Sequence, residues 1–357
     1  MRSATAIIAA LAASLLALAA QAEPLKVGVA APLSGPSAVV GDQIKAGAML
    51  AAERLGVSLE IIDDRCTTEG GAIAAQGFVD AQVAVATGFL CTESIEAALP
   101  VLKDAQIPVI SVGVRTDSLT DRRDKTGWQI FRLGPRGDNE REAAASLLTR
   151  LWNDELFAIV DDGTIYGREL AESFRASVEQ AGLKPVFVDT YRPQLDNQVA
   201  LVARLRKAGA THVFVGGDGE DIAVMGRDAA TLGDGMVFAG GETLRVADRA
   251  VPPAEGTLMV APPEWSDLAN SDVLSAFEAQ KLIPDGYSLP AYAAVEIARA
   301  AAELATSSGT PVTEVLARQE FDTAIGKIRF NAKGDLTENP YRLFRFDGSN
   351  YVPLETQ

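Results

Sequence analysis

The sequence predicts an α/β protein of two lobes, each built on a mainly parallel sheet with helices on both faces. Short apolar runs alternate with helical patterns of about 10 to 15 residues, as expected for parallel strands and the helices that connect them. The alternation breaks at a segment containing Gly and Pro, 134–137, and then restarts, which indicates a second lobe. The 357 residues are enough for two domains of ordinary size.

The first 22 residues have the features of a secretory signal peptide. They contain one Arg, an apolar run at 6–20 and the small-residue cleavage pattern Ala20-Gln21-Ala22. The run is short for a membrane span, and no later segment offers one. A retained N-terminal anchor is the alternative. We predict an exported, periplasmic protein.

Charge argues against two classes of partner. Cleavage after residue 22 would remove one of the 32 basic residues, leaving 31 basic and 48 acidic residues and a net charge of −17. Nucleic acids and anionic membrane surfaces attract basic proteins, so neither is expected to bind this chain.

The stretch 83–120 organises the first lobe. An apolar run at 83–86 predicts a buried strand, a helical pattern follows with Thr92 at its N-cap, and 107–112 predicts a second strand. Strand, helix and strand form a parallel βαβ unit, and ligands bind such sheets at the carboxyl ends of the strands. Thr92 and the turn Gly113-Val114-Arg115 should therefore lie on one rim, where we expect a ligand.

The remaining elements follow the same logic along the chain. The other predicted strands of the first half are 25–31, 57–63 and 128–133, and its helices are 69–79 and a segment ending near 55. In the second half, strands at 156–160, 186–188, 213–215 and 237–239 alternate with helices at 138–151, 166–181, 197–208 and 222–232. A run at 257–260 followed by two prolines predicts a second crossing between lobes, then helices at 273–280 and 289–304 and antiparallel strands at 325–330, 341–346 and 351–352.

Motifs of common enzyme classes are missing. The chain has no G-x-G-x-x-G after its first strand, no Walker-type loop, no H-E-x-x-H and no G-x-S-x-G. Its single histidine, His212, argues against His-based metal sites and a Ser-His-Asp triad. We predict a binding protein with no metal and no cofactor, although a carboxylate pair could still do acid–base chemistry.

Polar residues follow the predicted strands in both lobes. These are Thr92 and Arg115 in the first lobe and Tyr166, Asp218 and Glu242 in the second. Glu242 follows two glycines after a strand, where backbone and carboxylate can both approach a ligand. Together these residues would set a cationic site opposite an anionic one, as a zwitterion requires.

Four of these residues also have a local interpretation. Asp218 and Glu242 could cap the helices that follow them. Arg115 could pair with a neighbouring carboxylate, Asp117 or Asp121, and Tyr166 could pack its ring against a helix.

Cys66 and Cys91 are the only cysteines. An even number in an exported protein favours a disulfide. A nucleophilic cysteine is the alternative, but it needs a base, and His212 lies at the start of an apolar strand.

Several segments, in their order and spacing, carry a family resemblance. They are LKVGVAAPLSGPSAVVGDQIKAGAMLAAE, GFLCTES, IVDDGTIYGRELAESF, GGE at 240–242 and IGKIRFNAKGDL, together with the spacing of Cys66 and Cys91. The chain resembles, over essentially all of 25–350, the periplasmic leucine/isoleucine/valine-binding protein family, the type I solute-binding proteins of branched-chain amino acid ABC transporters.

The resemblance implies two lobes joined by three crossings, which close on a ligand by hinging. It implies a Cys66–Cys91 disulfide, a monomer and an inner-membrane ABC permease as partner. The expected division is a signal peptide at 1–22, an N-terminal lobe at 23–134 plus 262–340, and a C-terminal lobe at 135–261 plus 341–357.

Ligand contacts are also implied by family position. Thr92 and backbone N–H groups around it and around Gly113 and Val114 would bind a ligand carboxylate, Glu242 would bind the ammonium, and Tyr166 would lie over the ligand. Four positions depart from the family pattern, and at two of them, Val40 and Leu289, an aliphatic residue replaces a bulkier aromatic one. Arg115 stands where a small hydroxyl residue is usual, and Asp218 stands where an aromatic residue is common.

The resulting prediction is a periplasmic substrate-binding protein that captures an amino acid, of branched-chain type or a polar or carboxylate relative, for a permease. One alternative is a ligand-sensing subunit that presents its closed form to a membrane receptor. Another is an exported enzyme on the same scaffold that uses Glu242 or Asp218.

Overall fold

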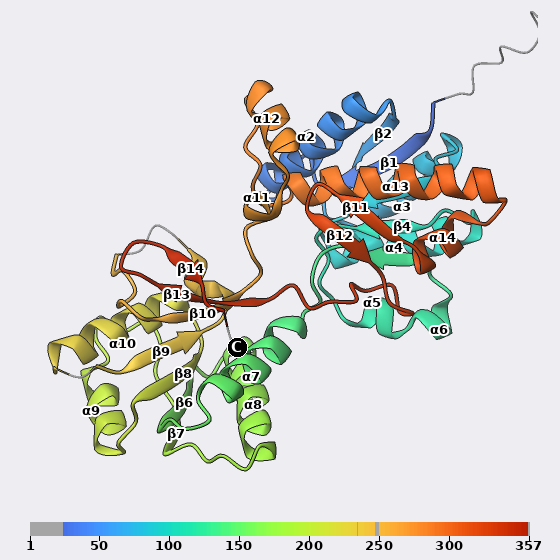
Figure 1. The fold of residues 1–357 in the computed structure, drawn as a ribbon. Coiled ribbons are helices and arrows are strands. Elements are labelled where there is room, and N and C mark those ends of the chain that lie inside the picture. The colour runs from blue at the N-terminus through green and yellow to red at the C-terminus, as the bar shows by residue number, and fades with distance from the viewer. Residues whose placement is uncertain (1–23, 234, 247–249, 356–357) are drawn as a thin grey trace, which may run out of the picture.

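The computed structural model describes residues 24–233, 235–246 and 250–355, which form two lobes (Figure 1). The predicted signal peptide at 1–22 lies outside the described residues. The chain passes between the lobes after β5, after β10 and before β13 (Figure 1). Within the described residues, no helix combines the length and the apolarity that crossing a bilayer requires.

The N-terminal lobe is built on a five-stranded sheet whose neighbouring strands are all parallel. Its strands, in spatial order, are β2 (Ser58–Asp63), β1 (Lys26–Ala31), β3 (Val85–Gly88), β4 (Val109–Ser111) and β5 (Ile130–Arg132). Its helices are α2 (Ala38–Leu55), α3 (Thr68–Asp80), α4 (Thr92–Asp104), α5 (Ser118–Asp121), α6 (Arg123–Thr126), α11 (Trp265–Leu268), α12 (Ser271–Ala279), α13 (Ser288–Ser308) and α14 (Val312–Arg318). A hairpin of β11 (Glu320–Thr323) and β12 (Gly326–Arg329) completes it.

Strands β1, β3, β4 and β5 are buried on both faces of the sheet, which explains why they appear as apolar runs, whereas the edge strand β2 is only partly buried. Successive residues alternate between two clusters: Val29 packs with α2 and α13, whereas Ala30 packs with α3 and α4. The helices α2 and α13 approach closely at Gly47, where a Cβ would lie 1.9 Å from the carbonyl oxygen of Ser288. A side chain at position 47 would therefore push these two helices apart.

The C-terminal lobe has a seven-stranded mixed sheet. Its strands, in spatial order, are β14 (Tyr351–Pro353), β13 (Arg342–Phe346), β10 (Leu258–Ala261), β9 (Val237–Gly240), β8 (His212–Gly216), β6 (Phe157–Asp161) and β7 (Phe187–Thr190). Strands β6 to β10 pair in parallel, and β13 and β14 add antiparallel strands from the end of the chain (Figure 1). Its helices are α7 (Asn139–Leu151), α8 (Ile165–Gln180), α9 (Val199–Lys207), α10 (Gly219–Thr231) and the short 3₁₀ helix η1 (Glu242–Arg245).

A buried ionic network stands where the chain first leaves the N-terminal lobe. Arg132 is 0 % exposed and donates from Nε to Asp335 Oδ1 at 2.9 Å. Arg136, on the crossing itself, donates to Asp335 Oδ2 at 3.1 Å and to Asp138 Oδ2 at 2.7 Å. Asp335 precedes the last crossing and Asp138 precedes α7, so the network ties two crossings to each other and to the second lobe.

The sequence-based elements are mostly confirmed, with three corrections. The strand predicted at 83–86 lies two residues further along the chain, because β3 spans Val85–Gly88 and its last residue pairs with Ser111. Cys91, and not Thr92, is the N-cap of α4. The predicted single strand at 325–330 is the second strand of the β11–β12 hairpin, whose first strand the sequence analysis missed.

Candidate ligand-binding site

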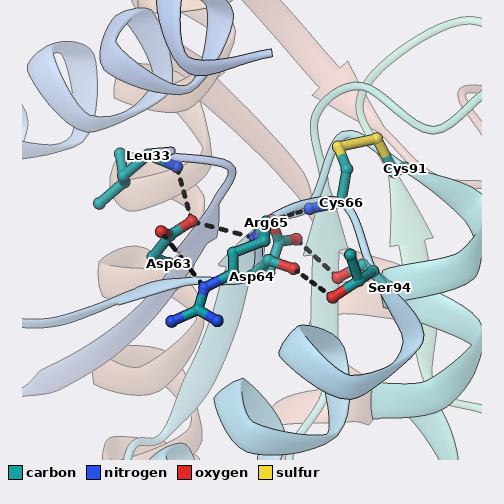
Figure 2. Close-up of a disulfide and its surroundings, with 8 residues drawn as sticks. Leu33, Asp63, Asp64, Arg65, Cys66, Cys91 and Ser94 are labelled. Carbon is teal, nitrogen blue, oxygen red and sulfur yellow. Dashed lines mark hydrogen bonds and ion pairs between the residues drawn. A yellow bond between two sulfur atoms is a disulfide. The ribbon is translucent and has the colours of Figure 1, made fainter. Parts of the chain in front are cut away.

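A disulfide anchors the rim of the N-terminal lobe. Cys66 and Cys91 are bonded, with their Cα atoms 5.1 Å apart, so neither is a free nucleophile (Figure 2). The bond joins the loop after β2 to the start of α4. Cys66 adopts the left-handed backbone conformation (φ 54°), which costs a non-glycine residue about 1–2 kcal/mol. Its N–H is held by Asp64 Oδ1 at 3.1 Å, and the other oxygen of Asp64 accepts from Ser94 at 2.6 Å.

Residues beside the disulfide form the predicted carboxylate-binding rim. The half-buried Thr92 shares a hydrogen bond of 2.6 Å with the Thr116 hydroxyl. Gly113 lines the cavity described below, and Val114 is buried with its N–H 3.4 Å from Ser111 Oγ. The carboxyl ends of β3 and β4 therefore bring Thr92 and the 113–115 turn to one side of the lobe. Their contact with a ligand stays a prediction.

Arg115 and Glu242 face each other from opposite lobes. Arg115 follows β4, Glu242 follows β9, and Arg115 Nη1 donates to Glu242 Oε1 at 2.5 Å. Tyr341, at the end of the last crossing, donates to Glu242 Oε2 at 2.9 Å and accepts from Arg115 at 3.2 Å. The side chains of Arg115 and Glu242 are 39 % and 28 % exposed. An interlobe ion pair thus replaces both local interpretations. Arg115 does not pair with Asp117 or Asp121, and the Glu242 carboxylate does not cap a helix.

Behind this pair lies a carboxylate that the sequence analysis did not select. Glu140, in the first turn of α7, accepts hydrogen bonds from the Glu242 N–H at 2.7 Å and from the Tyr166 hydroxyl at 2.9 Å. Burial, and after it the negative charge of Glu242, raises the pKa of Glu140 to about 7. Burial likewise raises the pKa of the Tyr166 hydroxyl, so Tyr166 is a neutral donor.

The ion pair borders a cavity of about 410 Å³ between the lobes, which we call the interlobe cavity. Its wall includes two aromatic side chains, Trp265 and Tyr287, and a second ion pair between Arg245 and Glu264. The remaining lining residues are Val112, Gly113, Gly134, Pro135, Thr243, Pro262, Pro263, Gly286 and Pro290. Charged groups of both signs and flat apolar walls suit a small ligand with a charged end and an apolar end.

Asp218 lies elsewhere on the C-terminal lobe. Its Oδ1 accepts from the Glu220 N–H at 2.8 Å as the N-cap of α10, which is the local role considered above. It also lines a different cavity, together with Asp221 and Arg227. Its contact with the ligand stays a prediction.

The family model described as periplasmic binding protein matches residues 24–350. This chain belongs to the periplasmic binding protein family. The leucine-, isoleucine-, valine-, threonine- and alanine-binding protein of Pseudomonas aeruginosa is 28 % identical over 340 residues, 91 % of this chain and 90 % of that protein. The leucine-specific-binding protein of Salmonella typhimurium is 29 % identical over 369 residues, 98 % of this chain and 99 % of that protein.

Solved structures of periplasmic binding proteins share the fold. A substrate-binding protein from Desulfitobacterium hafniense in complex with Leu superposes with a TM-score of 0.67 at 20 % identity, covering 93 % of this chain and 100 % of the other. A solute-binding protein from R. palustris in complex with benzoate gives 0.61 at 19 % identity, covering 93 % and 95 %. The fold is therefore that of a type I periplasmic binding protein.

Proposed function

We propose that this chain is the substrate-binding subunit of an ABC importer and that it encloses an amino acid in the interlobe cavity. The observation that carries the proposal is the ion pair between Arg115 of one lobe and Glu242 of the other. A ligand that contacts both residues stabilises the arrangement in which the lobes are close together. The matched family and the named ligands of its relatives support this reading.

The charges favour a zwitterion over a plain carboxylate. An ammonium group can take the place of the guanidinium beside Glu242, while the ligand carboxylate pairs with Arg115. Every charge then keeps an opposite partner, which partly buried charges need. A plain carboxylate, such as the benzoate of one structural neighbour, would occupy Arg115 and leave Glu242 with Tyr341 alone.

Removing either charge is expected to weaken amino acid binding roughly tenfold or more, because each change leaves a ligand charge without its partner. Thermal-shift screening against amino acids and aromatic carboxylates identifies the ligand, and calorimetry then compares the wild type with Arg115→Ala and Glu242→Ala. If the ligand is a plain carboxylate, only Arg115→Ala should weaken binding.

Matched controls come from an exposed pair on α8. Arg175 and Glu179 are ion-paired at 2.8 Å with side chains 54 % and 51 % exposed. Arg175→Ala and Glu179→Ala remove the same charges far from the interlobe cavity and should leave the affinity unchanged. Wild-type affinity in both Arg115→Ala and Glu242→Ala would refute the site.

Export and partner are part of the proposal. The apolar run at 6–20 and the Cys66–Cys91 bond support a periplasmic protein released by cleavage after Ala22. Mass spectrometry of protein recovered from the periplasm should give a chain beginning at Glu23. Size-exclusion chromatography should show a monomer. Capture of the closed protein by an ABC permease would support the importer, and capture by a membrane receptor would support the sensor.

A further inference from the structure

Glu140 is a buried carboxylate that the proposed ligand contacts do not use. It is 5 % exposed, and a single oxygen, Oε1, accepts from the Glu242 N–H at 2.7 Å and from the Tyr166 hydroxyl at 2.9 Å. This one oxygen therefore holds two of the three C-terminal-lobe residues that we expect to face the ligand, Tyr166 and Glu242.

The turn that carries Glu242 packs directly against this carboxylate. At Gly241 a Cβ would lie 2.0 Å from Glu140 Oε1 and 2.5 Å from the Tyr166 hydroxyl oxygen, so no side chain fits there. This close packing and the hydrogen bond from the Glu242 N–H therefore couple the position of Glu242 to that of the Glu140 carboxylate.

The charged and titratable groups around Glu140 come from several elements. Glu242 lies on η1, Tyr166 on α8, Arg115 on the turn after β4 and Tyr341 on the last crossing. Besides burial, the negative charge of Glu242 raises the pKa of Glu140, and the positive charge of Arg115 lowers it. Arg115 forms its ion pair with Glu242 and not with Glu140. A ligand charge placed between Arg115 and Glu242 therefore changes the electrostatic potential at Glu140.

We propose that Glu140 is a positioning residue of the ligand site and that it exchanges a proton with solvent when a ligand binds. The proposal rests on the proposed function. A ligand ammonium that takes the place of the Arg115 guanidinium beside Glu242 replaces one cation with another, so a zwitterion bound in this orientation should change the ionisation of Glu140 only slightly. A plain carboxylate on Arg115 favours protonated Glu140 and takes protons up. The size of the proton uptake thus distinguishes a plain carboxylate from a zwitterion.

Calorimetry in two buffers of different ionisation enthalpy measures the exchange. With benzoate as probe at pH 7, the wild type should take up as much as about half a proton per ligand bound, since a group near its pKa is half protonated. With L-leucine as probe, the exchange should be smaller. Glu140→Gln keeps an oxygen acceptor but cannot ionise, and it should abolish the exchange while changing affinity only a few-fold. Glu140→Ala removes the acceptor and should weaken binding tenfold or more.

Glu296 provides the matched control. It lies on α13 in the N-terminal lobe, accepts from the Ala324 N–H at 2.7 Å, and its pKa is raised by burial to about 7. Glu296→Gln should leave both affinity and proton exchange at wild-type values. An unchanged proton count in Glu140→Gln, or a loss in Glu296→Gln as large as in Glu140→Gln, would overturn the proposal.

A titration without ligand separates this proposal from the proposed function. If neither probe binds, NMR of protein labelled with ¹³C-glutamate still tests Glu140, whose carboxyl signal is assigned by its loss in Glu140→Gln. We expect a midpoint near neutral pH, with the Tyr166 ring signals changing at the same midpoint in the wild type and not in Glu140→Gln. A midpoint in the ordinary glutamate range would refute the role of Glu140 whatever the ligand is.

Discussion

Replacing Asp335 with Ala is expected to lower the free energy of unfolding by about 3 to 5 kcal/mol. The Arg132 guanidinium is 0 % exposed and Asp335 is its carboxylate partner. Its other hydrogen-bond acceptors include the carbonyl oxygen of Thr116 at 2.9 Å and the hydroxyl of Thr120 at 2.5 Å, which are both uncharged. Without Asp335 the charge would stay buried and uncompensated, and Arg136 would lose its 3.1 Å hydrogen bond as well.

Urea denaturation followed by tryptophan fluorescence measures this loss. The control is Asp272→Ala, which removes a carboxylate that is 81 % exposed and paired with Arg54. Exposed pairs contribute little, so this variant should lose less than about 1 kcal/mol. Equal losses in the two variants would show that burial of the Arg132–Asp335 pair has no energetic consequence.

Removing the disulfide should lower the free energy of unfolding by about 3 kcal/mol. Cys66 and Cys91 are 25 residues apart, and opening a loop of this length restores conformational entropy to the unfolded chain. The Cys66→Ser/Cys91→Ser variant and the wild type treated with a reducing agent should unfold at the same, lower urea concentration. The agent should have no further effect on the double variant. Equal stability with and without the bond would contradict the prediction.

The parallel strands were the most predictable part of the fold. Strand β6, Phe157–Asp161, has four buried residues in succession, so an apolar run marked it at 156–160 within one residue. Strand β11, Glu320–Thr323, buries only Phe321, and such a strand has no apolar run to detect. This exposed strand is recognised by its pairing with β12, because its own composition does not indicate a strand.

The two charges of the Arg115–Glu242 pair could be selected from the sequence, but the side chains that surround the pair could not. Arg115 and Glu242 could be selected because each lies within a few residues of the carboxyl end of a buried strand. Glu140 could not, because an acidic residue in the first turn of a helix is already explained by the helix dipole. Tyr341 is the first residue of the predicted strand at 341–346, and nothing in the sequence around it indicates a contact with Glu242. Only the packing of α7 and the last crossing against η1 brings both side chains to Glu242.

The close approach of α2 and α13 at Gly47 constrains the order in which the chain can fold. Strands β1 to β5 are synthesised by residue 132, but α13, which covers the Val29 face of their sheet, ends at Ser308. All the parallel strands of the other lobe are made in between. A nascent chain released at residue 261 would therefore cover the Val29 face of its first sheet with α2 alone and leave part of it exposed, and we expect it to aggregate instead of folding as half a protein.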